Sequence, residues 1–143
     1  MLIADVLKSK ATLGIVTVRP DLTVAEVAQI LTDHGIGAAV VSEDGEHVTG
    51  IVSERDVVRH LNTGGAEVLT GSVRAIMTRE VHTCVLEDEV VDLAGAMTER
   101  RIRHVPVLTD GQLSAIVSIG DVVKSRIDSL QAETEALRDY IQT

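Results

Sequence analysis

The chain contains one internal duplication, which constrains its fold more than any other feature of the sequence. Residues 17–46 align with residues 83–112 with eight identical positions in thirty. After a one-residue deletion in a turn, residues 48–61 align with residues 113–126 with six identical positions in fourteen. The repeating part of each unit holds about 45 residues, which is marginal for an independent core. We therefore expect the two units to pack together about a pseudo-twofold axis.

Each unit begins with a strand that is followed by a helix. In the first copy, the β-branched run 15–18 precedes a capping box formed by Thr23 and Glu26. Apolar residues then recur at helical spacing until Gly35, a residue type that commonly ends helices in the left-handed conformation. The second copy repeats this pattern, with its helix over about 88–100.

Two strands and a second helix complete the unit. Residues 37–42 and 48–53 predict strands joined by a hairpin turn at Asp44-Gly45, and a helix begins at Ser53. The order is thus β-α-β-β-α in each copy. The expected fold class is α+β, with two small sheets packed face to face by pseudo-twofold symmetry and helices flanking them.

The repeat divides the chain into four parts. We expect the first repeat with its lead-in over 1–65, a Gly-rich linker over 66–74, the second repeat over 75–128 and a polar helical tail over 129–143. In the tail, three apolar residues fall roughly on one helix face: Leu130, Leu137 and Ile141. This pattern suits packing against a partner or, alternatively, a solvated tail with a frayed end.

Composition argues against several functional classes. The formal net charge of −9 with no basic block disfavours nucleic acid and anionic membrane surfaces, although the thirteen basic residues still allow a local pocket for a small anion. The single Tyr and the absence of Phe and Trp leave no aromatic platform for single-stranded nucleic acid. One cysteine, Cys84, allows no intrachain disulfide and suits a reducing cytoplasm. We expect neither a signal peptide nor a membrane span.

A Ser-x-x-Asp motif opens the last helix of both copies, at Ser53/Asp56 and Ser118/Asp121. One interpretation is a capping box, since Ser at the N-cap and an acid three residues later satisfy backbone amides. The other is a ligand site, because a helix N-terminus favours phosphate and an Asp can accept hydrogen bonds from both hydroxyls of a ribose. Arg55 adds a cation beside the first motif.

Catalytic and metal sites are not indicated by the remaining motifs. The five histidines lack metal-ligand spacing, since no two lie within five residues of each other. Ser53, Asp56 and His60 share neighbouring helical turns and have no nucleophile elbow around them. The cluster Glu87-Asp88-Glu89 suits a helix start. We therefore expect a binding protein and not an enzyme, with no catalytic residues and no metal.

The duplicated unit as a whole resembles a tandem pair of CBS domains, also called a Bateman module. The segments that carry the resemblance are GIGAAVVSEDGEHVTGIVSERDVVR, RIRHVPVLTDGQLSAIVSIGDVVK and the lead-in AIMT at 75–78. The resemblance as a whole covers residues 2 to about 127. The chain is most similar to small stand-alone bacterial proteins made of one CBS pair, without an attached enzyme or channel.

This resemblance implies an adenosyl ligand: AMP, ADP, ATP, NAD(H) or S-adenosylmethionine. In the family the Ser of each turn contacts phosphate and the Asp contacts ribose, which here means Ser53 and Asp56, and Ser118 and Asp121. The family's adenine slots correspond to Thr17, Val18, Ala38 and Ala39 in the first copy, and to Thr83, Val85, Arg103, His104, Val105 and Pro106 in the second.

The resemblance also implies a regulatory, cytoplasmic protein that forms a homodimer and changes its shape or its affinity for an unidentified protein target. The alternative is a structural scaffold with vestigial sites. The two sites are not equivalent, because Arg55 has no counterpart in the second copy and the first lacks the Arg103-His104 pair. We expect Arg55 to approach a phosphate held next to His104.

Overall fold

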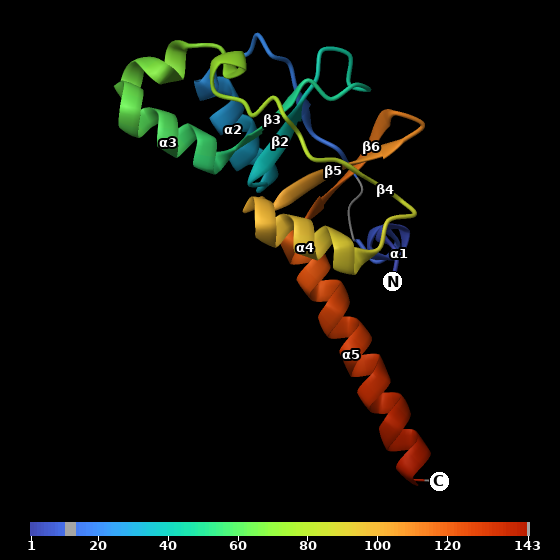
Figure 1. The fold of residues 1–143 in the computed structure, drawn as a ribbon. Helices are drawn as coiled ribbons and strands as arrows, with labels where there is room; N and C mark the ends of the chain where they lie inside the picture. Colours follow the sequence, from blue (N-terminus) through green and yellow to red (C-terminus); the bar gives the residue numbers. More distant parts are fainter. Residues whose placement is uncertain (11–13, 143) are drawn as a thin grey trace.

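The computed structural model describes residues 1–10 and 14–142, which form two three-stranded sheets with helices around them (Figure 1). In chain order the elements are α1 (Ile3–Lys8), β1 (Thr17–Val18), α2 (Val24–His34), β2 (Ala38–Val41), β3 (Gly50–Ser53), α3 (Glu54–Gly64), the 3-10 helices η1 (Gly65–Thr70) and η2 (Val73–Ala75), β4 (Cys84–Val85), α4 (Val90–Arg100), β5 (His104–Thr109), β6 (Gln112–Ser118) and α5 (Ile119–Gln142).

The two sheets have the same topology, which confirms the β-α-β-β-α order of both copies. Their strand orders are β1-β2-β3 and β4-β5-β6. In each sheet the first strand runs parallel to the middle strand, and the last runs antiparallel to it. The registers also agree, because Ala38 pairs with Ser53 and His104 pairs with Ser118. The middle strand of each copy therefore begins beside the serine of the Ser-x-x-Asp motif.

Local sequence signals explain where the first helix of each unit begins and ends. The Thr23 hydroxyl accepts a hydrogen bond from the backbone N–H of Glu26 at 3.1 Å, as the capping box predicts. Gly35 ends α2 in the left-handed conformation, with φ of 61°. The corresponding residue of the second copy is Arg101, which ends α4 with φ of 55°.

The hairpin turns of the two copies differ. Asp110 and Gly111 both have positive φ and form the expected two-residue turn between β5 and β6. In the first copy the prediction of a tight turn is wrong, because β3 begins only at Gly50 and residues 42–49 form a longer loop. The Asp44 carboxylate accepts hydrogen bonds from the backbone N–H groups of Glu46 and His47, which stabilises this longer loop.

The lead-in of each repeat packs into the core of the other repeat. Chain order places α1 beside the first repeat, yet Ile3, Val6 and Leu7 join the core formed by α4, β5, β6 and α5. Backbone bonds from Ile3 and Ala4 to the carbonyls of Asp88 and Leu86 fix this position. The N-terminal helix α1 therefore connects the first repeat to the core of the second.

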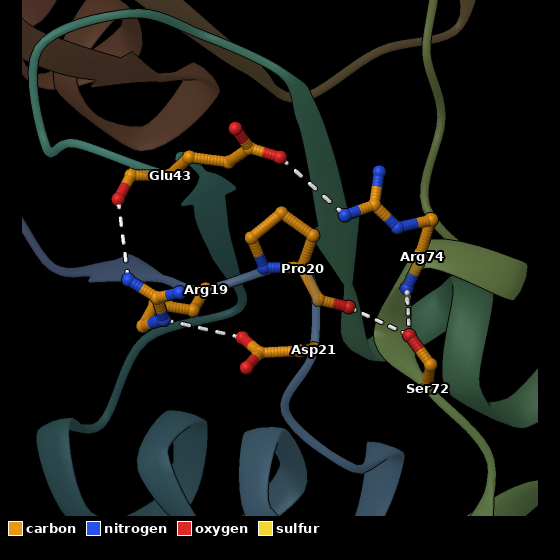
Figure 2. Close-up of polar contacts among 6 residues, drawn as sticks. All are labelled: Arg19, Pro20, Asp21, Glu43, Ser72 and Arg74. Atoms are coloured by element: carbon orange, nitrogen blue, oxygen red, sulfur yellow. Dashed lines mark hydrogen bonds and ion pairs between the residues drawn. The ribbon is translucent and has the colours of Figure 1, made fainter.

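The segment before the second repeat makes the reciprocal contact. Three of its residues are buried in the core of the first repeat: Val73, Ile76 and Met77. Figure 2 shows the polar contacts that hold its start, where the Ser72 hydroxyl donates to the carbonyl of Pro20 at 2.6 Å. Arg74 lies 3.4 Å from the Glu43 carboxylate, and Glu43 in turn accepts a bond from Arg19 through its backbone carbonyl.

The middle strands are buried on both faces, as sheets packed face to face require. Ala39 and Val41 belong to the core under α2 and α3. The alternate residues Ala38 and Val40 lie outside that cluster but are also buried, so they face the other repeat. Leu113 of β6 donates to the carbonyl of Glu46 across this boundary. The boundary between the sheets is where the candidate site lies.

The final helix is continuous from Ile119 to Gln142, as the sequence predicts for the tail. Its first turns are anchored, because Val122 and Ser125 are buried. Its later part projects away from the rest of the molecule (Figure 1). None of the helices in residues 1–10 and 14–142 is both long and apolar enough to cross a membrane.

Candidate functional site

A cavity of about 310 Å³ opens between the two repeats at the start of α3. This volume lies at the lower end of the range of small-molecule sites. Three parts of the chain line it: the β2–β3–α3 region, the segment before β4, and the end of α4 with the start of β5. The lining residues are Gly37, Ala38, Ile51, Ser53, Glu54, Arg55, Asp56, Arg59, Thr78, Glu80, Val81, His82, Arg100, Arg101, Ile102, Arg103 and His104.

The Ser53/Asp56 motif forms a complete capping box inside this cavity. The Ser53 hydroxyl oxygen accepts from the backbone N–H of Asp56 at 3.2 Å. One carboxylate oxygen, Asp56 Oδ2, accepts from the Ser53 backbone N–H at 2.9 Å and from the Ser53 hydroxyl at 3.1 Å. These bonds all use one oxygen of a residue that is only 7% exposed. Capping therefore fixes the Asp56 carboxylate at the cavity wall through Oδ2, and these bonds do not use Oδ1.

Arginines concentrate around the same cavity. Five line it, Arg55, Arg59, Arg100, Arg101 and Arg103, against the three acids Glu54, Asp56 and Glu80. The whole chain has a formal net charge of −9, so this local excess of cations runs against the overall balance. The start of α3 adds its positive dipole end. Together these features favour an anion, and guanidinium groups match phosphate oxygens particularly well.

Arg101 occupies a backbone conformation that arginine rarely adopts. It has φ of 55° and ψ of 43° at the end of α4, where the first copy has Gly35 at 61° and 36°. A side chain in this region costs about 1–2 kcal/mol relative to the right-handed conformation. Strain of this kind clusters at ligand sites. The strained turn places Arg101 on the cavity wall.

His104 lies where the two repeats meet. Burial lowers the pKa of its imidazole, whereas the charges of Glu54 and Asp121 act in the opposite direction, and Lys10 and Arg103 lower the pKa further. Its ring also lies against Gly37, where a Cβ would come within 3.5 Å of the imidazole carbon Cε1. A neutral imidazole that gains a proton would add one more cation next to a bound anion.

The second Ser-x-x-Asp motif is also a capping box, but its carboxylate is already engaged. Asp121 Oδ2 accepts from the Ser118 backbone N–H at 2.9 Å and from the Lys10 ammonium at 2.9 Å. Lys10 also donates to the carbonyl of Ile116 at 2.8 Å. Burial opposes ionisation of Asp121, but the Ser118 amide and the Lys10 ammonium outweigh it and lower the pKa of this carboxyl. An ammonium thus lies where the resemblance places a ribose.

The structure brings together some of the predicted site residues and separates others. Those lining the cavity are Ala38, Ser53, Arg55, Asp56, Arg103 and His104. The predicted neighbours Val18, Ala39 and Val105 instead belong to the hydrophobic cores. The residues Thr17, Thr83, Val85, Pro106, Ser118 and Asp121 do not line it either. Because successive strand residues point to opposite faces, only every second residue of β2 and β5 can face the cavity.

Sequence reasoning missed four residues around the first motif, Gly37, Ile51, Glu54 and Arg59, and two further parts of the lining. The segment Thr78 to His82 precedes the second repeat, and its contact with the first repeat depends on the exchange of lead-ins. The missed residues Arg100 and Arg101 at the end of α4 had a visible signal, because they form a short basic run with the predicted residues Arg103 and His104. A run of this kind at a helix end, one strand away from a Ser-x-x-Asp motif, would have indicated an anion site.

A separate exposed group lies in the loop 42–49. Ligand atoms of Asp44, Glu46 and His47 lie within 4.8 Å of one another. Hydrogen bonds from His47 lower the pKa of Asp44, the backbone N–H contributing more than the imidazole. The imidazole Nδ1 lies 2.6 Å from Asp44 Oδ2, and this carboxylate raises the pKa of His47. The carboxylate of Asp44 thus holds the loop together.

Comparison with known proteins assigns the chain to a family. The sequence profile of the CBS domain matches residues 3–63 and again residues 73–128. The chain belongs to the CBS-domain family. Its relatives include the mitochondrial CBS domain-containing protein CBSX3 of Arabidopsis thaliana, which is 37% identical over 147 residues, or 98% of this chain and 71% of that protein. The two duplicated units are therefore a tandem pair of CBS domains.

Solved CBS structures share the fold. The CBS-domain containing protein ATU1752 from Agrobacterium tumefaciens has a TM-score of 0.84 at 43% identity, with 88% of this chain and 99% of that chain covered. The CBS domain pair of protein MJ0100 has a TM-score of 0.76 at 26% identity, with 92% and 98% covered. That pair was solved in complex with 5′-methylthioadenosine and S-adenosyl-L-methionine.

Proposed function

We propose that this CBS pair binds one adenine nucleotide per chain, in the cavity at the start of α3, and acts as a regulatory module. The observation that carries the proposal is the presence of a fixed carboxylate and a cluster of arginines in one cavity between the repeats. A carboxylate can accept hydrogen bonds from the hydroxyls of a ribose, and arginines can bind a phosphate. The adenosyl compounds bound by the MJ0100 pair support an adenosine-containing ligand.

Each part of the nucleotide has a matching wall in the cavity. Asp56 accepts hydrogen bonds from the ribose hydroxyls through Oδ1, because Oδ2 already serves the helix cap. Ala38, Ile51 and Val81 supply apolar surface for the base. Aliphatic contacts of this kind suit a chain with no Phe or Trp.

The phosphates extend toward the arginines. Arg55 and His104 line the same cavity, as the hypothesis of a phosphate between them requires. We expect Arg55→Ala to weaken binding of ATP more than binding of adenosine, because only ATP has phosphates for the guanidinium to contact. Titration calorimetry with both ligands measures this difference, and an equal loss for both would place Arg55 away from the phosphates.

The second Ser-x-x-Asp motif, at Asp121, binds no nucleotide in this proposal. Lys10 holds Asp121 with an ion pair whose side chains are only 22% and 21% exposed. A ribose at this position has to displace the ammonium from two hydrogen-bond acceptors. The role is then regulatory and not catalytic: the nucleotide shifts the relative position of the repeats by its different affinity for two arrangements. A cytoplasmic location and a partner protein stay predictions of the sequence.

A thermal-shift panel tests the proposed function. The ligands are AMP, ADP, ATP, NADH, S-adenosylmethionine and adenosine. A ligand at about 100 times its dissociation constant should stabilise the fold by about 2.7 kcal/mol. We expect the phosphate-bearing adenosyl ligands to give the largest shifts. No shift with any of the six contradicts the proposal and favours a scaffold with vestigial sites.

A further inference from the structure

The outer part of α5 has an unpartnered apolar stripe. Every residue from Leu130 to Gln142 is exposed, and this segment projects from the body of the molecule (Figure 1). The stripe consists of Val123, Ile127, Leu130, Leu137 and Ile141, which are 50%, 49%, 45%, 63% and 79% exposed. Helices in proteins gain most of their stability from packing of an apolar face, so an exposed apolar stripe on a projecting helix is a candidate interface.

The spacing of the stripe is that of a coiled coil. From Val123 to Ile141 the intervals alternate between four and three residues, with Thr134 as the one polar member. This alternation is the spacing of the a and d positions in the heptad repeat of a coiled coil. In heptad notation Val123, Leu130 and Leu137 are d positions, and Ile127, Thr134 and Ile141 are a positions.

From this pattern we propose that α5 pairs with α5 of a second copy of this chain in a parallel, in-register coiled coil. The stripe is self-complementary, as a twofold interface between identical chains requires. Apolar surface also continues from its base onto α4, where Val91 is 70% exposed. A groove beside it is lined mostly by apolar residues, Met1, Val90, Val91, Ala94 and Val122, with the charged residues Glu89 and Arg126. The stripe on α5 covers only about two and a half heptads, which alone would give a small interface. We expect the exposed surface of α4 to enlarge it.

The charges beside the stripe select the parallel orientation. In a parallel pair the g position Glu133 of one copy faces the e position Arg138 of the other, and symmetry makes this contact twice. An antiparallel pair with the stripes fully overlapped would place Lys124 opposite Arg138 and Glu133 opposite Glu133. Like charges oppose each other in that arrangement, whereas opposite charges meet in the parallel one.

Disulfide cross-linking of the full chain tests both the partner and the orientation. In a parallel pair Leu137→Cys lies opposite itself, so we expect a covalent dimer after mild oxidation. The matched control is Asp139→Cys, two residues along on the outer face, which should stay monomeric on a non-reducing gel. The native Cys84 adds no background because it is buried, and burial with the nearby Asp88 charge raises the pKa of its thiol to about 11.

Light scattering on the wild-type and variant chains completes the test. We expect the wild type to have twice the 15.3 kDa chain mass, and Leu130→Glu with Leu137→Glu to give the monomer. Glu133→Arg should weaken the dimer about tenfold, and adding Arg138→Glu should restore it. A monomeric wild type, a double-Glu variant that stays dimeric, or cross-linking of Ile127→Cys to Leu137→Cys without self-cross-linking of Leu137→Cys would overturn the proposal. None of these readouts depends on a nucleotide.

Discussion

Replacing Arg101 with glycine should make the protein more stable and a poorer binder of phosphate. The residue ends α4 in the left-handed conformation, where the first copy has Gly35. Glycine adopts this conformation without steric cost, so the substitution removes strain from the folded state. It also removes one of the five guanidinium groups around the cavity. Stability and binding should therefore change in opposite directions.

Both magnitudes follow from the local structure. Relief of the left-handed strain contributes about 1–2 kcal/mol, and the greater freedom of glycine in the unfolded chain offsets about 0.4–1 kcal/mol of it. The net gain of about 0.5 kcal/mol raises Tm by about 1–2 °C for a chain of this length. A charge-assisted hydrogen bond contributes about 1.5–3 kcal/mol, reduced to about 1 kcal/mol here because Arg101 is exposed. The Kd for ATP should then rise about fivefold.

Two matched variants separate strain from charge. Arg101→Ala removes the guanidinium but keeps a side chain in the left-handed region, so it should weaken ATP equally without the gain in Tm. Gly35→Ala introduces the same strain in the first copy and should lower stability by about 1 kcal/mol. Chemical denaturation and titration calorimetry measure the two effects. If Arg101→Gly lowers stability, or if ATP binds to it as tightly as to the wild type, the reasoning about this turn is wrong.

Three other perturbations address the two Ser-x-x-Asp turns and the histidine between them. Asp56→Glu preserves the capping box, so stability should change by less than about 0.5 kcal/mol, while the longer side chain misplaces the carboxylate and weakens nucleotide about tenfold in calorimetry. Lys10→Met should lower the free energy of unfolding by about 2 kcal/mol and Tm by about 5 °C, because it breaks the ion pair with Asp121. It should also raise the number of nucleotides bound per chain from one toward two, because the Asp121 carboxylate is released. An unchanged stoichiometry refutes this. Because burial lowers the pKa of His104, the unbound protein should lose stability as pH falls through about 6.5, the unfolded value. ATP should bind more tightly at about pH 6 than at about pH 8, and His104→Asn should reduce this difference.

Much of the fold could be predicted from local rules and the repeat. Thr23 and Gly35 mark the ends of α2 because a hydroxyl cap and a left-handed residue act on their own helix. The duplication extends these local signals to the second copy. The exchange of lead-ins could not be predicted in this way, since Ile3 and Val73 are equally apolar and nothing local says which core each one enters.

The candidate site was predicted in part for similar reasons. Ser53 and Asp56 lie in the cavity because one helix turn determines their positions. Val18 and Ala39 were predicted to contact the ligand but lie in the core. The alternation of strand residues between the two faces of a sheet explains their positions, and this rule can be applied from the sequence of each strand alone. The ion pair of Lys10 with Asp121 joins residues far apart in the chain, and no local pattern indicates it.

Calorimetric titration of ATP into the wild type, Asp56→Ala and Asp121→Ala tests the proposed nucleotide site most directly. We expect one site per chain in the wild type. Asp56→Ala should abolish measurable binding, and Asp121→Ala should leave one site with similar affinity, because Lys10 already occupies that carboxylate. Binding that survives Asp56→Ala but disappears in Asp121→Ala would contradict the assignment of the nucleotide to the cavity at the start of α3.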